Sequence, residues 1–423
     1  MNVHILDAAV EFIEQPFVKP LQISSGLITK ATEARVRVRV RVGTREGTGR
    51  GSIYLSDLWA WPGPVPDRSL KDGTMRGLCE CLAASLPDAC GGEAGHPLEL
   101  GLRLHHSLSE AGFAFPEMPL LARGVCASPF DAALHDAVGQ ALGMSAFRFY
   151  DEPAPIPSAD AWFPAQGACG AIARVLRAPA SSLDAWWVVG AKDDLETGVH
   201  PAIERTGIRC FKIKTLAKDN AADAARTAEI FRAARSWGIE NPVLSVDSNE
   251  GNPDTASVLD YLERLEAMNP DAYSALDYLE QPTARDITKQ PFAWHEVGAR
   301  KPVFLDEGLT SLELLPVAKE QGWSGLALKT CKGHSFTLVS AAWAAENGLQ
   351  LSLQDLTNPG YSAIHAFLVG AHLATRNGVE LNSPQYTPDA NAAWLPRLDG
   401  LFAVRNGRHR FPNPDSPGLG SGA

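Results

Sequence analysis

The alternation of apolar and polar residues predicts strands at the start of the chain. Valine and arginine alternate strictly over residues 35–42, which is the period-two pattern of a strand with one buried and one solvated face. Residues 3–12 are also expected to be extended, and residues 43–51 contain enough glycine for a hairpin turn and a following strand. Residues 21–32 are polar and weakly patterned, so we expect a loop there.

The pattern becomes helical from residue 69 to about residue 142, where apolar positions recur every three or four residues. Strands followed by helices predict a compact α+β domain over residues 1–150. Three prolines over residues 150–158 then indicate a linker. The C-terminal segment, residues 391–423, is rich in Pro, Gly and Arg, and we expect it to pack back on the first domain.

Eight short apolar runs follow the linker. Their carboxyl ends succeed one another at intervals of about 23 to 33 residues, which is the length of a strand, a helix and two turns. Eight such units close a barrel, so residues 151–390 are predicted to form a (β/α)8 barrel and the chain to be an α/β protein. The runs are residues 186–190, 210–214, 243–247, 276–280, 303–306, 326–329, 351–354 and 379–382.

Charge and composition narrow the class of partner. The formal net charge of -11 disfavours binding to nucleic acid or to an anionic membrane surface. No window approaches the roughly 18 apolar residues of a membrane span, and no leader segment is evident, so we expect a soluble, cytoplasmic protein. The seven cysteines lack the paired spacing of a zinc site and fit reduced thiols. A small molecule is therefore the expected partner.

Ionisable side chains stand at the carboxyl ends of five consecutive predicted strands. Any one of them could be a solvated loop residue or a helix N-cap. Five in register predict an active site, because barrels of this kind build their sites from the carboxyl ends of several strands. The five residues are Lys214, Asp247, Glu280, Asp306 and Lys329.

The three carboxylates among them suggest a metal ion. Asp247, Glu280 and Asp306 come from neighbouring strands and offer only hard oxygen ligands. Such ligands suit Mg2+ better than zinc, and Mn2+ is the expected substitute.

The lysines suggest acid/base chemistry. Lys212 and Lys214 are two residues apart on one strand, so both point to the same face. Mutual repulsion is expected to lower the pKa of one of them toward the range of a general base. Lys329 lies four strands away, across the barrel mouth. A base on each side of a substrate carbon allows racemisation or epimerisation.

Together these residues resemble the enolase superfamily, and within it the muconate-lactonizing subgroup of the mandelate racemase/muconate lactonizing enzyme family. The resemblance covers nearly the whole chain. It rests on the order and spacing of Ala133-Leu134-His135-Asp136, Lys212-Ile213-Lys214, Asp247-Ser248-Asn249, Glu280-Gln281-Pro282, Asp306-Glu307, Lys329 and Pro417-Gly418-Leu419-Gly420.

The resemblance implies an enzyme with an N-terminal capping domain and a homo-oligomeric assembly. It implies Mg2+ on the three strand-end carboxylates and acid/base roles for Lys214 and Lys329. The expected reaction is abstraction of the proton α to the carboxylate of a small acid, through an enediolate that a cation stabilises. Racemisation, epimerisation or cycloisomerisation is the leading outcome, and a lyase would share the first step. A Schiff-base aldolase would leave the carboxylates unexplained, and a silent metal-binding scaffold would not need both lysines.

The last two predicted strands depart from related branches of the superfamily. The mandelate-racemase-like branch pairs a seventh-strand His with a sixth-strand Asp, whereas this chain has Lys329 on the sixth strand and Ser352-Leu353-Gln354-Asp355 on the seventh. Dipeptide epimerases carry Asp-x-Asp on the eighth strand, where this chain has Glu380-Leu381-Asn382. Dipeptide specificity is therefore not implied.

Several other residues are expected near the mouth. Asp355 either contacts substrate or caps the following helix. Trp59 and Trp61 either close over the mouth as part of a lid or pack within the capping domain. His334 is expected at the surface, with a pocket position as the alternative. The residues expected to bind substrate or to support those that do are Asn249, Glu307, Asp355 and Asn382.

Overall fold

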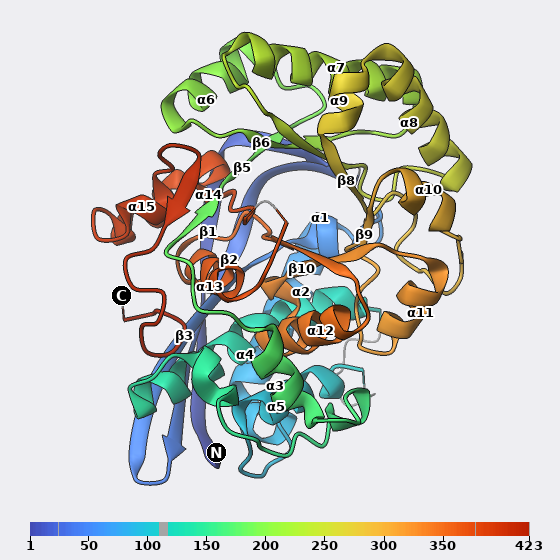
Figure 1. Ribbon diagram of the computed structural model, residues 1–423. Helices are drawn as coiled ribbons and strands as arrows, with labels where there is room; N and C mark the ends of the chain where they lie inside the picture. Colours follow the sequence, from blue (N-terminus) through green and yellow to red (C-terminus); the bar gives the residue numbers. More distant parts are fainter. Residues whose placement is uncertain (24, 110–116, 377, 423) are drawn as a thin grey trace.

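The computed structural model describes residues 1–23, 25–109, 117–376 and 378–422 (Figure 1). At its N-terminus three antiparallel strands, β1 (Val3–Ile23), β2 (Gly26–Val42) and β3 (Arg45–Leu55), form a sheet in that order. The valines of residues 36–40 are buried and the alternating arginines lie on the opposite face. The strand predicted from the alternation is confirmed.

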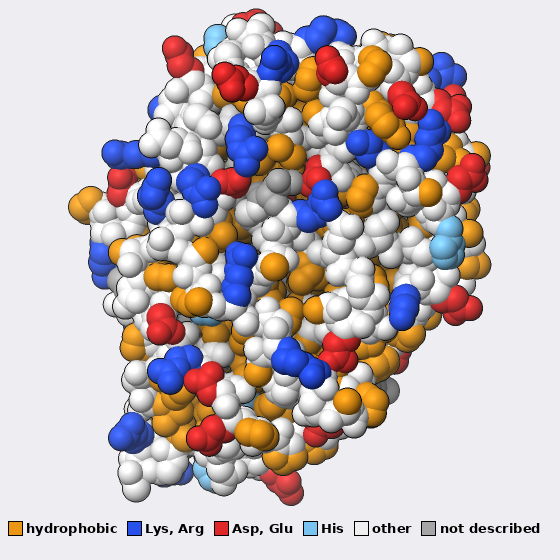
Figure 2. Space-filling model, in the orientation of Figure 1, with side chains coloured by type: hydrophobic (Ala, Val, Ile, Leu, Met, Phe, Trp, Pro, Cys, Tyr) orange, Lys and Arg blue, Asp and Glu red, His pale blue; other side chains and the backbone are white. Residues whose placement is uncertain are grey.

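The arginines of β2 pair with acidic residues across the sheet. Arg37 lies 3.0 Å from Asp7, and Arg39 lies 2.8 Å from Asp7 and 3.1 Å from Glu46. Over the face in Figure 2, Lys and Arg side chains are likewise interspersed with Asp and Glu. The run of arginines is therefore the solvated side of a sheet whose charges are largely matched.

The prediction of a loop over residues 21–32 is wrong for most of that range. β1 continues to Ile23 and β2 starts at Gly26, so the segment is the tip of a long hairpin. Leu21 pairs with Ile28 in the register, and the side chains of Leu21, Ile23 and Ile28 are buried. The sequence did not indicate these strands, because only a few widely spaced residues of the segment are apolar. Their burial depends on contacts with the rest of the molecule. Residue 24 lies outside the described residues.

Two helices, α2 (Arg68–Ala89) and α4 (Leu120–Leu142), pack on this sheet, and α1 (Asp57–Ala60) and α3 (Pro97–Ser107) pack against them. Helix α4 packs directly on β3 because Gly47, Gly49 and Gly51 leave room for its backbone. A Cβ atom on Gly49 would lie 2.1 Å from the carbonyl oxygen of Ala133 in α4. Helix and sheet thus approach more closely than side chains would allow.

The second half of the chain carries a curled parallel sheet. Its order is β11-β10-β9-β8-β7-β6-β5, so neighbouring strands are also consecutive in sequence. Seven of the eight predicted strands are present within about one residue at each end. They are β5 (Trp186–Val189), β6 (Cys210–Lys214), β7 (Val243–Asp247), β8 (Leu276–Glu280), β9 (Val303–Leu305), β10 (Gly325–Lys329) and β11 (Gln350–Gln354).

Helices follow the strands and lie on the outer side of the sheet, as βα units require (Figure 1). They are α6 (His200–Thr206), α7 (Asn220–Ser236), α8 (Thr255–Met268), α9 (Pro270–Ala275), α10 (His295–Arg300), α11 (Leu314–Gln321), α12 (His334–Glu346) and α13 (Gly360–His372). The remaining elements are η1 (Ala146–Tyr150), η2 (Asp160–Trp162), α5 (Gly167–Val175), β4 (Ser182–Asp184), η3 (Leu195–Val199), η4 (Thr330–Lys332), α14 (Ser383–Tyr386), η5 (Pro388–Trp394), α15 (Asp399–Phe402) and β12 (Arg408–Arg410).

The eighth predicted strand is reduced to a bridge that closes the barrel. Val379 pairs with Leu353 on one side and with Ala185 on the other, both in parallel. Helix α14 begins at Ser383, so in the described part of the chain no strand continues beyond Val379 there. The side-chain amide of Gln385 makes the hydrogen bonds to β5 that a strand would have made. It donates to the carbonyl of Val188 at 2.7 Å and accepts from its N–H at 3.2 Å. Within the described residues, the barrel is therefore closed by the two bridges of Val379 and by the side chain of Gln385.

Beneath the carboxyl ends of the strands the barrel interior is apolar. A separate buried cluster consists of Trp186, Cys210, Tyr278, Phe304 and Ala327, with the rings of Tyr278 and Phe304 stacked at 4.6 Å. Charged groups above this floor are thus cut off from water on one side, which strengthens their mutual interactions.

The C-terminal segment contacts both halves of the molecule. β12 pairs antiparallel with β4, and the N–H of Leu419 donates to Asp136 of α4 at 2.8 Å. The division into residues 1–150, 151–390 and 391–423 stays a prediction. Among the described residues, no helix combines the length and apolar character needed to cross a bilayer.

Candidate active site

The strand-end residues expected from the sequence lie together at one edge of the sheet. Lys214, Asp247 and Glu280 are the last residues of β6, β7 and β8, and each is in register with the next. Asp306 directly follows β9, and Lys329 ends β10. The parallel register therefore brings five charged side chains to one rim.

Lys212 lies at the centre of this cluster. Its ammonium is 2.8 Å from Glu280, 3.0 Å from Glu380 and 3.2 Å from Asp247, and it donates to the side-chain oxygen Oε1 of Gln354 at 2.9 Å. Burial lowers the pKa of Lys212, but the surrounding carboxylates outweigh it and hold the pKa well above its ordinary value. The expected depression of a lysine pKa by mutual repulsion is wrong at this residue, because carboxylates are its nearest neighbours.

Lys214 is held differently. Its ammonium contacts Asp247 at 2.5 Å and donates to Asn249 at 3.1 Å, and 12% of its side chain is exposed, against 1% for Lys212. Asn249 also donates to Glu307 at 3.0 Å. Asn249 thus connects the lysine at the end of β6 with the carboxylate that follows Asp306.

On the other side of the mouth, two lysines share one carboxylate. Lys329 lies 2.8 Å from Asp306 Oδ2 and 3.9 Å from Glu280, while Lys332 lies 3.1 Å from Asp306 Oδ1. Burial lowers the pKa of Lys329, but Asp306 and Glu280 raise it above its ordinary value. The sequence-based site did not include Lys332. Lys332 lies three residues after Lys329, which is one turn of the 3-10 helix η4, and this spacing could have indicated that both lysines face the same side.

Trp59 of α1 covers this pair. Its ring lies 4.9 Å from the Lys329 ammonium and 5.9 Å from that of Lys332, and its indole N–H donates to Glu307 at 2.8 Å. Trp59 thus contacts the mouth and is also buried in the hydrophobic core, so both alternatives for it hold in part. Trp61 is buried and forms no described contact with these charged groups.

The end of β11 is bound to the eighth βα unit, which here means residues 379–382. Asp355 accepts from the N–H groups of Thr357, at 2.8 Å, and Asn382, at 3.0 Å. It therefore bridges two strand ends and does not cap α13. Burial, together with Glu380, raises the pKa of Asp355 to about 8. Asn382 donates to Glu380 at 2.7 Å, so Glu380 is shared between Asn382 and Lys212.

The surface position expected for His334 is wrong. Its side chain is 1% exposed and its ring lies 4.6 Å from that of His135 in α4. His334 begins α12, and α12 is covered by the helices of the first half of the chain, which the local sequence could not indicate. Burial holds the pKa of His334 well below its ordinary value.

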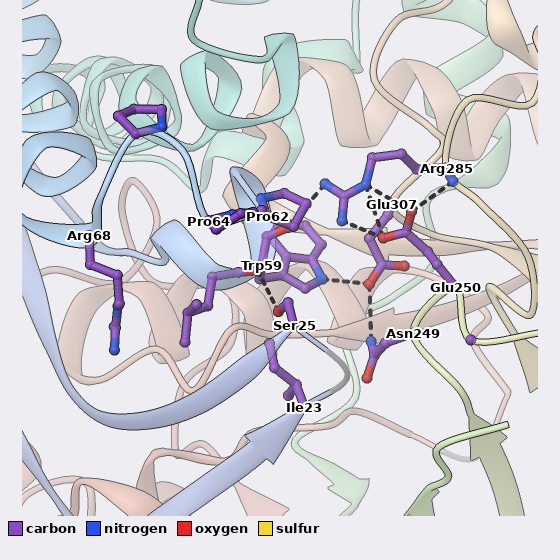
Figure 3. Close-up of a pocket in the computed structure, with 14 residues that line it drawn as sticks. Ile23, Ser25, Trp59, Pro62, Pro64, Arg68, Asn249, Glu250, Arg285 and Glu307 are labelled. Atoms are coloured by element: carbon purple, nitrogen blue, oxygen red, sulfur yellow. Dashed lines mark hydrogen bonds and ion pairs between the residues drawn. The ribbon is translucent and has the colours of Figure 1, made fainter. Parts of the chain in front are cut away.

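A cavity of about 620 Å³ opens beside the charged cluster (Figure 3). Ile23, Ser25 and Trp59 line it from the first half of the chain, and Asn249 and Glu307 line it from the barrel. Since Asn249 and Glu307 contact the residues around Lys214, a small molecule in this cavity would meet the cluster from that side.

Comparison with known proteins identifies the family. Residues 194–422 match the family model for enolase C-terminal domain-like proteins. The chain belongs to the enolase superfamily. The recognition of the mandelate racemase/muconate lactonizing enzyme family from sequence motifs is confirmed, and so is the prediction of an enzyme. A search of curated protein sequences finds no match.

Solved structures of this superfamily share the fold over nearly the whole chain. Muconate lactonizing enzyme from Pseudomonas fluorescens, complexed with muconolactone, is 20% identical over 99% of this chain and 96% of its own, with a TM-score of 0.65. N-succinyl Arg/Lys racemase from Bacillus cereus is 16% identical over 99% and 95%, with a TM-score of 0.67. An enolase from Bradyrhizobium, complexed with magnesium and mandelic acid, is 18% identical over 99% and 96%, with a TM-score of 0.65. The predicted fold class is confirmed.

The charges of this enolase superfamily site leave room for a divalent cation. Four lysines face six carboxylates, which is a formal excess of two negative charges. Burial, with neighbouring carboxylates, raises the pKa of both Glu280 and Glu307, and Glu307 Oε2 has no hydrogen-bond partner among the described residues. The groups are Lys212, Lys214, Lys329 and Lys332 against Asp247, Glu280, Asp306, Glu307, Asp355 and Glu380.

The ligand geometry expected for Mg2+ is not formed in this arrangement. No three His, Cys, Asp or Glu side chains within the described ranges lie together as ligands of one ion. Instead the ammonium of Lys212 bridges Asp247 and Glu280, and that of Lys329 bridges Asp306 and Glu280. The donor type and the charge fit Mg2+, and assignment of the metal ligands stays a prediction.

Proposed function

We propose that this protein is a Mg2+-dependent isomerase that moves the proton α to the carboxylate of a small organic acid. The observation that carries this proposal is the pair of lysines, Lys214 and Lys329, at the ends of strands four positions apart around one barrel. Between them lies a rim of buried carboxylates over an apolar floor. Two bases facing one carbon from opposite sides are what a change of configuration requires.

Asp247, Glu280 and Asp306 are the proposed ligands of the metal. When bound there, a divalent cation would offset the negative charge that develops on the substrate carboxylate as the α-proton leaves. The same three groups hold the two lysines, so their positions determine where each ammonium points.

Lys214 is the proposed group that first takes the proton. It contacts a single carboxylate and one amide, and part of its side chain reaches solvent. Lys329 would return a proton from the opposite side, beneath the Trp59 indole that keeps water from it. Lys212 is proposed to position Glu280 and Asp247, because its ammonium already donates to Glu280 and Gln354 and pairs with Asp247 and Glu380.

The eighth unit limits the substrate class. A substrate ammonium would need a free carboxylate there, but Glu380 is already bound by Lys212 and Asn382. We therefore propose a carboxylic acid without an ammonium group at that position. Muconolactone and mandelic acid, the ligands of two structural relatives, are small acids of this general kind.

The experiment is α-proton exchange in deuterated water with Mg2+, followed by NMR and mass spectrometry over a panel of hydroxy acids, N-acylamino acids and unsaturated diacids. Lys214→Ala and EDTA should each abolish exchange. Lys218→Ala is the matched control, since Lys218 is exposed on the loop that follows Lys214 and forms no described contact. Product mass separates an isomerase from a lyase. Exchange that persists in Lys214→Ala would refute the assignment of the base.

A further inference from the structure

Two turns at the barrel mouth are joined by one ion pair. Arg285, after β8, donates from Nε and Nη2 to the carboxylate of Glu250, which follows β7, with Nε–O distances of 2.9 and 3.0 Å. The backbone N–H of Arg285 donates to the same carboxylate at 2.8 Å. Only 23% and 20% of the two side chains are exposed. A planar guanidinium paired this way is fixed in orientation as well as in distance.

The same guanidinium reaches the first half of the chain. Nη1 of Arg285 donates to the backbone carbonyl of Trp59 at 3.1 Å. The indole of Trp59 then donates to Glu307 and lies over Lys329. Figure 3 shows this series of contacts, with Arg285 and Glu250 on the barrel side and Trp59 facing them. Arg285 is thus fixed to the barrel and holds the backbone from which the indole extends.

The backbone beneath this contact is strained. Asn249, Glu250 and Gln281 have φ angles of 43°, 69° and 35°, in the left-handed region that residues other than glycine rarely adopt. The N–H of Glu250 donates to the carbonyl of Gln281 at 2.9 Å, so the two turns brace each other. Strained conformations of this kind persist only where surrounding contacts hold them, and they cluster at functional sites.

We propose that Arg285 is a positioning residue for Lys329: by joining Glu250 to the Trp59 carbonyl, it holds the indole over the lysine ammonium. The inference rests on the proposed function of Lys329 in proton transfer. Lysine could not replace this arginine. The planar guanidinium donates to the Glu250 carboxylate and to the Trp59 carbonyl from different nitrogens, whereas a lysine has a single ammonium that cannot reach both. Arg285→Lys therefore keeps the charge and removes the connection.

The direct test is 19F NMR of the full-length protein labelled with 5-fluorotryptophan. The Trp59 resonance is the one missing from Trp59→Phe. Arg285→Lys should shift or broaden that resonance and leave those of the other nine tryptophans in place. Arg300→Lys is the matched control, because Arg300 also binds two carboxylates but on the outer surface. An unchanged Trp59 resonance in Arg285→Lys would overturn the proposal.

The second readout is kcat/KM for α-proton exchange. Arg285→Lys should lower it by roughly tenfold or more, the effect of losing a charged hydrogen bond, while Arg300→Lys leaves it unchanged. A shifted Trp59 resonance with unaltered exchange would also overturn the role in positioning Lys329. If the wild-type protein exchanges no substrate, the proposed function fails, whereas the NMR experiment still tests whether Arg285 holds Trp59.

Discussion

Replacement of Lys212 by methionine should destabilise the protein by about 3–5 kcal/mol, because it leaves a buried carboxylate without its cation. The contacts indicate how many carboxylates are affected. Asp247 keeps Lys214, and Glu280 keeps a longer contact with Lys329 and a hydrogen bond from Gln354. Among the described residues, the Glu380 carboxylate keeps only a hydrogen bond from Asn382. The expected loss is therefore that of about one uncompensated charge.

The loss of unfolding free energy in Lys212→Met should be larger at high pH than at low pH. The folded-state pKa of Glu280 already lies above its unfolded value, mainly through burial and then through Asp247. Removal of the Lys212 ammonium raises it further. A raised carboxyl pKa contributes stability that is fully present below the unfolded value, about 4.3, and is lost as pH rises through the folded value. The deficit of Lys212→Met should thus be larger at pH 8 than at pH 5.5.

Urea unfolding followed by circular dichroism, in EDTA at pH 8 and pH 5.5, measures both effects. Lys218→Met is the control, since Lys218 is exposed and without a described partner. A change below about 1 kcal/mol at pH 8, the range of a surface ion pair, would refute the reasoning. So would a deficit that grows on acidification.

Three further predictions follow from the site and the packing. Mg2+ added to EDTA-treated protein at pH 8 should raise Tm, and Glu280→Gln should abolish most of that shift in differential scanning calorimetry. Gly49→Ala should destabilise by about 1–3 kcal/mol or more in urea unfolding, because its Cβ would meet α4, whereas Gly73→Ala, in open space within α2, should stabilise by about 0.5–1 kcal/mol. Burial lowers the pKa of His365 to about 3 and that of His409 to about 4, so the stability they confer should be lost as pH falls from about 6.5 through those values. His365→Gln should flatten this acid limb, and an unchanged limb would contradict the assignment.

Local patterning was enough to locate the strands of the barrel and most of its rim. The strands at 210–214, 243–247 and 276–280 are short apolar runs bounded by polar turns, and their observed ends agree with those predicted. A charged residue at the end of such a run reaches the rim whatever the details of packing, because all strands are parallel. The position of Lys214, Asp247 and Glu280 at one edge therefore followed from the sequence.

Contacts between distant segments needed the tertiary structure. Nothing near Trp59 or Arg285 in the sequence indicates that they meet, since 226 residues separate them. The pKa of Lys212 is raised because the carboxylates of Glu280 and Glu380, from other strands, lie 2.8 and 3.0 Å from its ammonium. The sequence does not show that these groups meet. The hairpin at 21–32 and the buried His334 were missed for the same reason.

The sequence by itself thus determined which elements form and which chemical groups reach the rim, because periodicity and strand polarity are local properties. Only the tertiary structure decided which cation pairs with which carboxylate, which indole covers the mouth, and how the eighth unit closes the barrel through Gln385. Those outcomes depend on distances across the closed barrel. Such distances come from packing all the elements at once, and no single segment carries them.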